Sequence, residues 1–134
     1  MARIKVSSAK AKGRKLQQTV AAMIADCLNI RSGKDELIES REMGQSGTDV
    51  KLYGEALERF PYAIECKWQE TWSLPAWIKQ AKENTSDKMP HWLLFVKKNR
   101  HEEVVILDAE HFFELMNVVD NDLARASYPS RRIK

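Results

Sequence analysis

Hydrophobic positions recur at helical spacing in three stretches of the chain and follow strand-like patterns in five shorter ones. Apolar residues three or four positions apart indicate one face of a helix, and short alternating or continuous apolar runs indicate strands. The helical stretches are residues 10–28, a stretch that begins at Ser73, and a stretch that follows Asp108. The strand-like stretches are residues 36–41, 48–53, 62–68, 91–97 and 103–107. The predicted order is α-β-β-β-α-β-β-α, an α/β fold with a single mixed β-sheet flanked by helices.

The same pattern assigns side chains to the core or to the surface. In the last helical stretch, the spacing predicts that four residues face the core: Phe112, Leu115, Met116 and Val119. Residues 54–61 carry no periodic pattern and are predicted to form a polar connection. The three histidines share no metal-ligand spacing and are expected at the surface or at helix caps: His91, His101 and His111.

Length and composition favour one domain in a reducing compartment. A chain of 134 residues suits a single domain over residues 1–134, with a basic N-terminal segment at 1–15 and a basic C-terminal tail at 125–134. No apolar run approaches the roughly 20 residues of a membrane span, and no apolar stretch follows the basic N-terminus as in a secretory signal. The two cysteines, Cys27 and Cys66, form no CxxC pair, so a cytoplasmic location is expected.

Charge is distributed unevenly, with basic ends around an acidic middle. Residues 1–34 carry eight basic and one acidic side chain, residues 35–124 carry 10 basic and 18 acidic, and residues 125–134 carry four basic and no acidic. Basic ends suit a polyanionic partner, usually nucleic acid, and a solvated terminus is the alternative. The candidate phosphate contacts are Lys10, Lys12, Arg14, Lys15, Arg131 and Arg132.

The strand at residues 62–68 carries the candidate chemistry. Alternation along a strand places Glu65 and Lys67 on one face and Cys66 on the opposite, apolar face. If the neighbouring strand presents Asp49 on the side of Glu65, two carboxylates and one lysine converge. Carboxylate oxygens suit Mg²⁺, which can assist hydrolysis of a phosphodiester. The alternative is an exposed strand face with opposite charges paired across strands.

These residues resemble the PD-(D/E)XK nuclease superfamily, and within it the Holliday junction resolvase-like endonucleases of phages and archaea. The similarity covers residues 12–96. It depends on Lys12-Gly13, Ser40-Arg41, Ser46-Gly47-Thr48-Asp49-Val50, Glu65-Cys66-Lys67 and Gln80. The resemblance implies a restriction-endonuclease-like core, whose order of elements matches the one predicted above.

The resemblance also implies a role for each residue of the motifs. Asp49 and Glu65 are expected to bind the catalytic Mg²⁺, for which Mn²⁺ can substitute, with the backbone carbonyl of Cys66 as a further ligand. Lys67 is expected beside the attacking water, and Gln80 reaches toward the same site. The remaining candidate DNA contacts are Ser40, Arg41, Ser46 and, as a DNA or dimer contact, Trp72.

One position departs from the family pattern. Resolvases of this type often carry Glu four residues after the glycine of the first helix, where this chain has Gln17. Glutamine can orient water or a metal-bound water through its amide but brings no negative charge. Gln17 is therefore a candidate catalytic residue, with an ordinary solvent-facing glutamine as the alternative.

The function implied by the resemblance is metal-dependent, structure-selective DNA cleavage. A homodimer would resolve four-way (Holliday) junctions by paired nicks, in the bacterial host cytoplasm if the protein is phage-encoded. Two other functions stay open on the sequence alone. One is a non-catalytic protein that binds branched DNA through a vestigial site, as Gln17 suggests. The other is a nuclease that acts on flaps, nicked duplexes or single strands.

Overall fold

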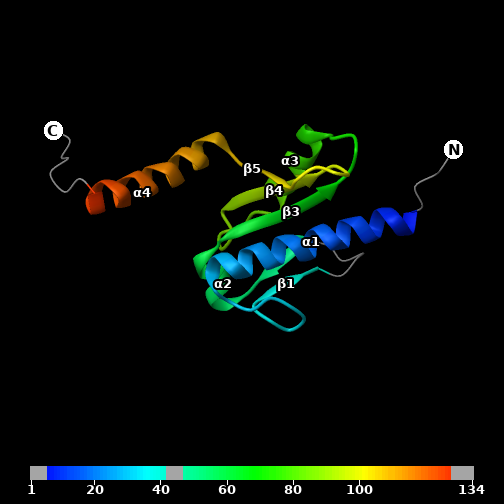
Figure 1. Ribbon diagram of the computed structural model, residues 1–134, viewed down its shortest axis with the longest axis horizontal. Coiled ribbons are helices and arrows are strands. Elements are labelled where there is room, and N and C mark those ends of the chain that lie inside the picture. The colour runs from blue at the N-terminus through cyan, green and yellow to red at the C-terminus, as the bar shows by residue number, and fades with distance from the viewer. Residues whose placement is uncertain (1–5, 42–46, 128–134) are drawn as a thin grey trace.

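Helices and short strands alternate in the computed structural model, which describes residues 6–41 and 47–127 (Figure 1). The helices are α1 (Val6–Leu28), α2 (Gly54–Arg59), α3 (Leu74–Glu83) and α4 (Ala109–Ser127). The strands are β1 (Ile38–Ser40), β2 (Val50–Leu52), β3 (Tyr62–Trp68), β4 (His91–Lys97) and β5 (Val104–Ile106). This arrangement confirms the predicted α/β class. Within the described ranges, no helix has the length and apolar character needed to cross a bilayer.

The strands form two hydrogen-bonded ladders. In the larger one, β3 pairs with β4 in parallel and β4 pairs with β5 antiparallel, whereas β1 and β2 form a small antiparallel ladder. Asp49 joins the two ladders, because its N–H donates to the Ile64 carbonyl at 2.8 Å while its own carbonyl accepts from the Arg41 N–H at 2.8 Å. The sheet that the sequence predicts as one unit is thus two ladders, which Asp49 links just before β2.

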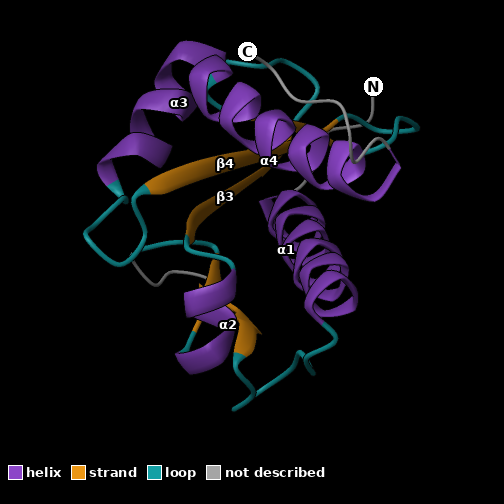
Figure 2. Cartoon of the chain, turned by 90° about the vertical axis from the view of Figure 1, so that its left-hand side faces the viewer, coloured by secondary structure: helices purple, strands orange, loops and turns teal. Residues whose placement is uncertain are grey.

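Helices α1 and α3 cover opposite sides of β3 and β4 (Figure 2). On one side, Val20 of α1 belongs to the same buried cluster as Ile64 and Cys66 of β3. On the other side, Trp77 of α3 packs in a second cluster with Leu94 of β4. Strands buried on both faces are typical of parallel pairing. Because α1 and α3 pack on its two faces, β3 is held in place, and each of its side chains points toward one helix or the other.

Two helices differ in extent from the prediction. Residues 54–61, predicted to be a polar connection, contain α2, which buries Ala56 and carries an ion pair between Arg59 and Glu55 at 2.9 Å. A helix of six residues is too short to show a full apolar period in the sequence. Helix α1 begins at Val6 instead of residue 10, because its first turns extend beyond the part that packs on the sheet.

Helix α4 departs furthest from the prediction. Phe112, Leu115, Met116 and Val119 were assigned to the core, but all four side chains are exposed, since α4 extends away from the sheet (Figure 1). The prediction for His111 is also wrong: this side chain is buried, and its Nε2 lies 2.5 Å from the Tyr62 hydroxyl oxygen. Spacing identifies an apolar face of a helix but not the surface that covers it.

Candidate active site

The turn that precedes β2 positions Asp49. Gly47 has a φ of 97°, a backbone conformation that glycine adopts without steric cost. The Thr48 hydroxyl then donates to the Val50 carbonyl at 3.2 Å and tightens the turn. Asp49 follows with only 4% of its surface exposed, directed at the edge of β3. The Gly-Thr-Asp sequence thus buries a carboxylate against the neighbouring strand.

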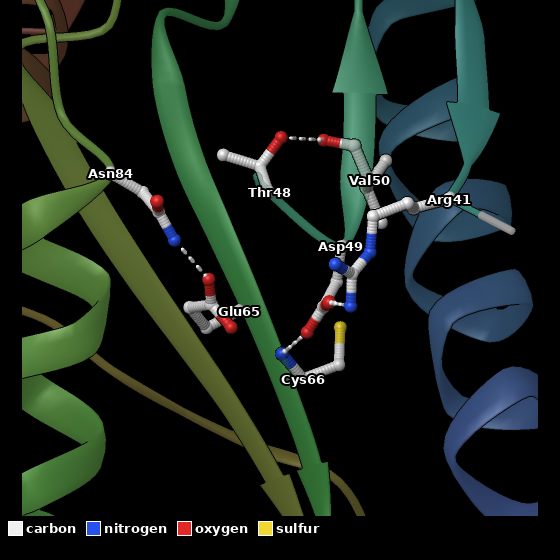
Figure 3. Close-up of polar contacts among 7 residues, drawn as sticks. All are labelled: Arg41, Thr48, Asp49, Val50, Glu65, Cys66 and Asn84. Atoms are coloured by element: carbon white, nitrogen blue, oxygen red, sulfur yellow. Dashed lines mark hydrogen bonds and ion pairs between the residues drawn. The ribbon is translucent and has the colours of Figure 1, made fainter. Parts of the chain in front are cut away.

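Both carboxylate oxygens of Asp49 accept hydrogen bonds. The Arg41 Nη2 donates to Oδ1 at 2.8 Å, and the backbone N–H of Cys66 donates to Oδ2 at 2.7 Å (Figure 3). Charge-assisted bonds of this kind are stronger than neutral ones and fix the orientation of the carboxylate. Asp49 is therefore held at one side of β3 by an arginine from the end of β1 and by the backbone of β3 itself.

Glu65 is a buried acid at the centre of β3. It is 1% exposed, and its Oε1 accepts a hydrogen bond from the Asn84 Nδ2 at 2.5 Å (Figure 3). Burial raises the pKa of Glu65 to about 7, and the charge of Asp49 and a side-chain hydrogen bond with it act in the same direction. Asn84 and Lys67 lower this pKa in part. Two carboxylates thus share one site in which a single proton or a cation would relieve their repulsion.

Lys67 lies two positions along β3 on the same face as Glu65. Its Nζ is 5.9 Å from the centre of the Trp77 ring, on the side of the sheet that α3 covers. Cys66, between them, packs in the cluster under α1, and burial raises the pKa of its thiol well above the usual value. The predicted alternation is confirmed. Cys66 is a core residue whose backbone, not its thiol, faces the site.

A pocket of about 480 Å³ opens over these groups between α1 and β3. Eight of the predicted site residues line it: Lys12, Gln17, Arg41, Asp49, Glu65, Cys66, Lys67 and Gln80. They come from α1, from the end of β1, from the turn before β2, from β3 and from α3. Five separate segments therefore converge on one cavity that contains both carboxylates.

Other predicted residues lie elsewhere. Lys10, Arg14 and Lys15 are exposed on α1, on the helix that borders the pocket, while Ser40 lies on β1 at a different surface. Trp72 packs against the cluster under α3, with the Lys98 Nζ 5.4 Å from its ring centre. Three predicted DNA contacts, Ser46, Arg131 and Arg132, lie outside the described residues.

The sequence did not predict two side-chain contacts of the pocket carboxylates, one of Glu65 and one of Asp49. Asn84, which ends α3, was not expected near Glu65, because the two residues are 19 positions apart and nothing in the local pattern marks the contact. Arg41 was considered as a DNA contact, and its ion pair with Asp49 was not foreseen. The only available signal was the position of Arg41 at the end of a strand predicted to neighbour Asp49.

The donors of the pocket fit a hard divalent cation. No group of three or more His, Cys, Asp or Glu side chains suited to a metal occurs among the described residues. Oxygen donors other than carboxylates complete the set, however. The Gln17 Oε1 is buried and has no hydrogen-bond partner within the described ranges, and Gln17 lines the pocket. Asp49, Glu65, the Cys66 carbonyl and Gln17 together offer the all-oxygen environment that Mg²⁺ prefers.

One known family matches the chain over almost its whole length. A family model described as a phage putative PDDEXK endonuclease matches residues 8–133. No curated protein and no solved structure is significantly similar to the chain. The match includes every residue that lines the pocket.

Proposed function

The chain belongs to the phage putative PDDEXK endonuclease family, and from that membership we propose a Mg²⁺-dependent, structure-selective DNA endonuclease that resolves four-way (Holliday) junctions by paired nicks. As a member of the PD-(D/E)XK superfamily it is a nuclease, and such nucleases generally use divalent metal ions. The observation that carries the proposal is the convergence of Asp49, Glu65 and Lys67 on one pocket.

Each of these side chains supports a part of phosphodiester hydrolysis. Asp49 and Glu65 would hold the metal ion, with the Cys66 carbonyl and the Gln17 amide oxygen as further donors. When bound, the metal supplies charge stabilisation at the phosphate and a lower pKa for water. Lys67 lies on the same strand face as Glu65, so its ammonium group can orient the attacking water and stabilise the charge that builds up on the phosphate.

Gln17 is the residue with which the metal affinity can be tuned. We expect Gln17→Glu to raise the Mn²⁺ affinity about tenfold, because a carboxylate replaces a neutral oxygen donor and affinity follows ligand charge. Isothermal titration calorimetry measures the change. Gln18→Glu is the matched control, since Gln18 is the exposed neighbour on α1 and does not line the pocket. An equal gain in both variants, or none in Gln17→Glu, would remove Gln17 from the metal site.

The charge distribution supports DNA as the partner of this site. We propose that Lys10, Arg14 and Lys15 contact DNA phosphates beside the pocket, so that the duplex is positioned without reading its sequence. The whole chain, residues 1–134, then acts as one nuclease domain. A homodimer in the bacterial host cytoplasm would place two such sites on the two sides of a junction.

The test compares substrates of different shape. Labelled four-way junction, linear duplex, flap and single strand are incubated with Mg²⁺, with Mn²⁺ or with EDTA. We expect symmetric paired nicks in the junction alone, and none in EDTA. Cleavage of a flap or single strand in place of the junction would keep the metal site and reject the junction as substrate.

A second function is favoured by one contact of the site. Arg41 already neutralises Asp49, and Gln17 adds no charge, which is what a vestigial site that binds DNA without cutting would show. Mn²⁺ calorimetry separates the two functions. A catalytic site binds the ion, and binding is lost in Asp49→Asn, whereas a vestigial site does not bind it.

A further inference from the structure

Helix α4 is anchored by its first turn and extends away from the sheet beyond it (Figure 1). His111 holds this turn, because its Nε2 lies 2.5 Å from the Tyr62 hydroxyl oxygen and its ring stacks on His91 at a centroid distance of 3.8 Å. None of residues 112–126, the part of the helix beyond His111 whose side chains the structure describes, is buried. Helices gain most of their stability from packing of an apolar face, and nothing within residues 6–41 and 47–127 covers this face of α4.

Four of the exposed side chains form a continuous seam along α4. Phe112, Met116, Val119 and Leu123 are separated by four, three and four positions, and each is between 42% and 60% exposed. This is the spacing of the a and d positions in a coiled coil, where each apolar side chain inserts between four residues of a facing helix. Because the repeat averages 3.5 residues, the seam stays on one side of the helix and suits a second helix with the same repeat.

The apolar surface of α4 is large enough for a stable interface. Phe113 and Leu115 are exposed beside the seam, and Phe113 is 68% exposed. At roughly 100 Å² for each partly exposed side chain, the six together present about 600 Å², so two copies would bury about 1,200 Å², the lower end of the range for stable interfaces. Patches of this size on a soluble protein mark interaction sites.

The charges of α4 disfavour a polyanion as its partner. The helix carries four acidic side chains, Glu110, Glu114, Asp120 and Asp122, against one basic side chain, Arg125. DNA phosphates and anionic lipid head groups are therefore repelled. None of the four acids occupies an a or d position, and Glu110 and Glu114 lie on the side opposite the seam. The seam itself is apolar and can pack against the same seam of a second copy of the chain.

We propose that α4 is the dimerisation element of this protein, and that a second copy of the chain packs its own α4 along this seam about a two-fold axis. A two-fold interface uses the same patch on both partners, which a self-matching seam provides. The association needs neither DNA nor metal. Dimerisation would couple two nicks in one junction, and this consequence rests on the proposed function.

Sedimentation equilibrium in EDTA and without DNA tests the association by itself. We expect the wild-type chain at about 31 kDa, twice the 15.5 kDa of one chain. Met116→Glu and Val119→Glu should each raise the dissociation constant at least about a hundredfold, because a charge would be buried in the seam. Both side chains are exposed in the single chain, so neither change disturbs the core, and circular dichroism checks this.

The matched control is Asn121→Glu, which adds the same charge to the opposite side of α4 and should leave the dimer intact. A monomeric wild type, a Val119→Glu dimer as tight as wild type, or equal weakening by Asn121→Glu would each overturn the proposal. On junction DNA, Val119→Glu should nick one strand per event. A dimer that cuts no junction would reject the proposed function while leaving the interface in place.

Discussion

Replacing Asp49 with Asn is expected to reduce the single-turnover rate of junction cleavage by at least about a thousandfold, which corresponds to roughly 4 kcal/mol of transition-state stabilisation. The carboxylate is one of two acids in the pocket, and the amide that replaces it is neutral and a weaker ligand. Junction binding, measured by mobility shift in Ca²⁺ or EDTA, should remain within about threefold, because binding depends mainly on the basic side chains outside the pocket.

Lys67→Ala should give a similar loss of cleavage for a different reason. The proposed metal ligands stay in place, so we expect Mn²⁺ binding to persist, but the ammonium group proposed to face the reacting phosphate is gone. The two changes are therefore distinguished by calorimetry, which detects metal in Lys67→Ala and not in Asp49→Asn.

Exposed residues of the same type provide the controls. Asp26→Asn on α1 and Lys79→Ala on α3 make the same chemical changes outside the pocket, and both should cleave at the wild-type rate. A folded Asp49→Asn protein with wild-type cleavage would remove this carboxylate from the active site. Thermal unfolding must accompany the assay, because Asp49→Asn also weakens the ion pair with Arg41.

The sequence predicted the strands of the site because their signals are local. Strands β3 and β4 have the bounds that the apolar runs indicated, residues 62–68 and 91–97. Once β3 is a strand, the alternation of Glu65 and Lys67 against Cys66 follows from backbone geometry alone. A buried parallel strand with two charged residues on one face is itself unusual, because burial of charge is costly without a partner or a function.

The parts of the site that the sequence did not predict depend on contacts between distant segments. Asn84 reaches Glu65 only because α3 packs on the face of β3 that carries Glu65, and helix packing angles leave no mark in a local pattern. The ion pair of Arg41 with Asp49 likewise depends on the way the β1–β2 ladder meets β3. The core prediction for α4 was wrong for a different reason, because its apolar spacing is clear but no residue in the described part of the chain covers its apolar face.

In the absence of divalent metal, the stability of the wild-type protein is expected to fall as pH rises through about 7. The pKa of Glu65 is raised from 4.5 in the unfolded chain to about 7 in the folded one, first by burial and then by Asp49. The folded state therefore holds this proton more tightly than the unfolded state does. The resulting stability is fully present below pH 4.5 and is lost as pH rises through the folded pKa. The loss amounts to about 2–3 kcal/mol in the free energy of unfolding by pH 8.

Glu65→Gln removes this loss, because a neutral amide can accept the hydrogen bond from Asn84 and donate one toward Asp49 at any pH. Urea unfolding in EDTA between pH 5 and 8 measures this. We expect the free energy of unfolding of the wild type to fall relative to that of Glu65→Gln as pH rises. Glu83→Gln, an exposed substitution on α3, should show the same pH dependence as the wild type. If the free energy of unfolding changed equally with pH in wild type and Glu65→Gln, the carboxyl group of Glu65 would not be protonated in the folded protein at pH 5. The expected result has a further consequence for function: the acid pair that would hold a metal destabilises the protein without it, so metal binding should stabilise wild type and not Glu65→Gln.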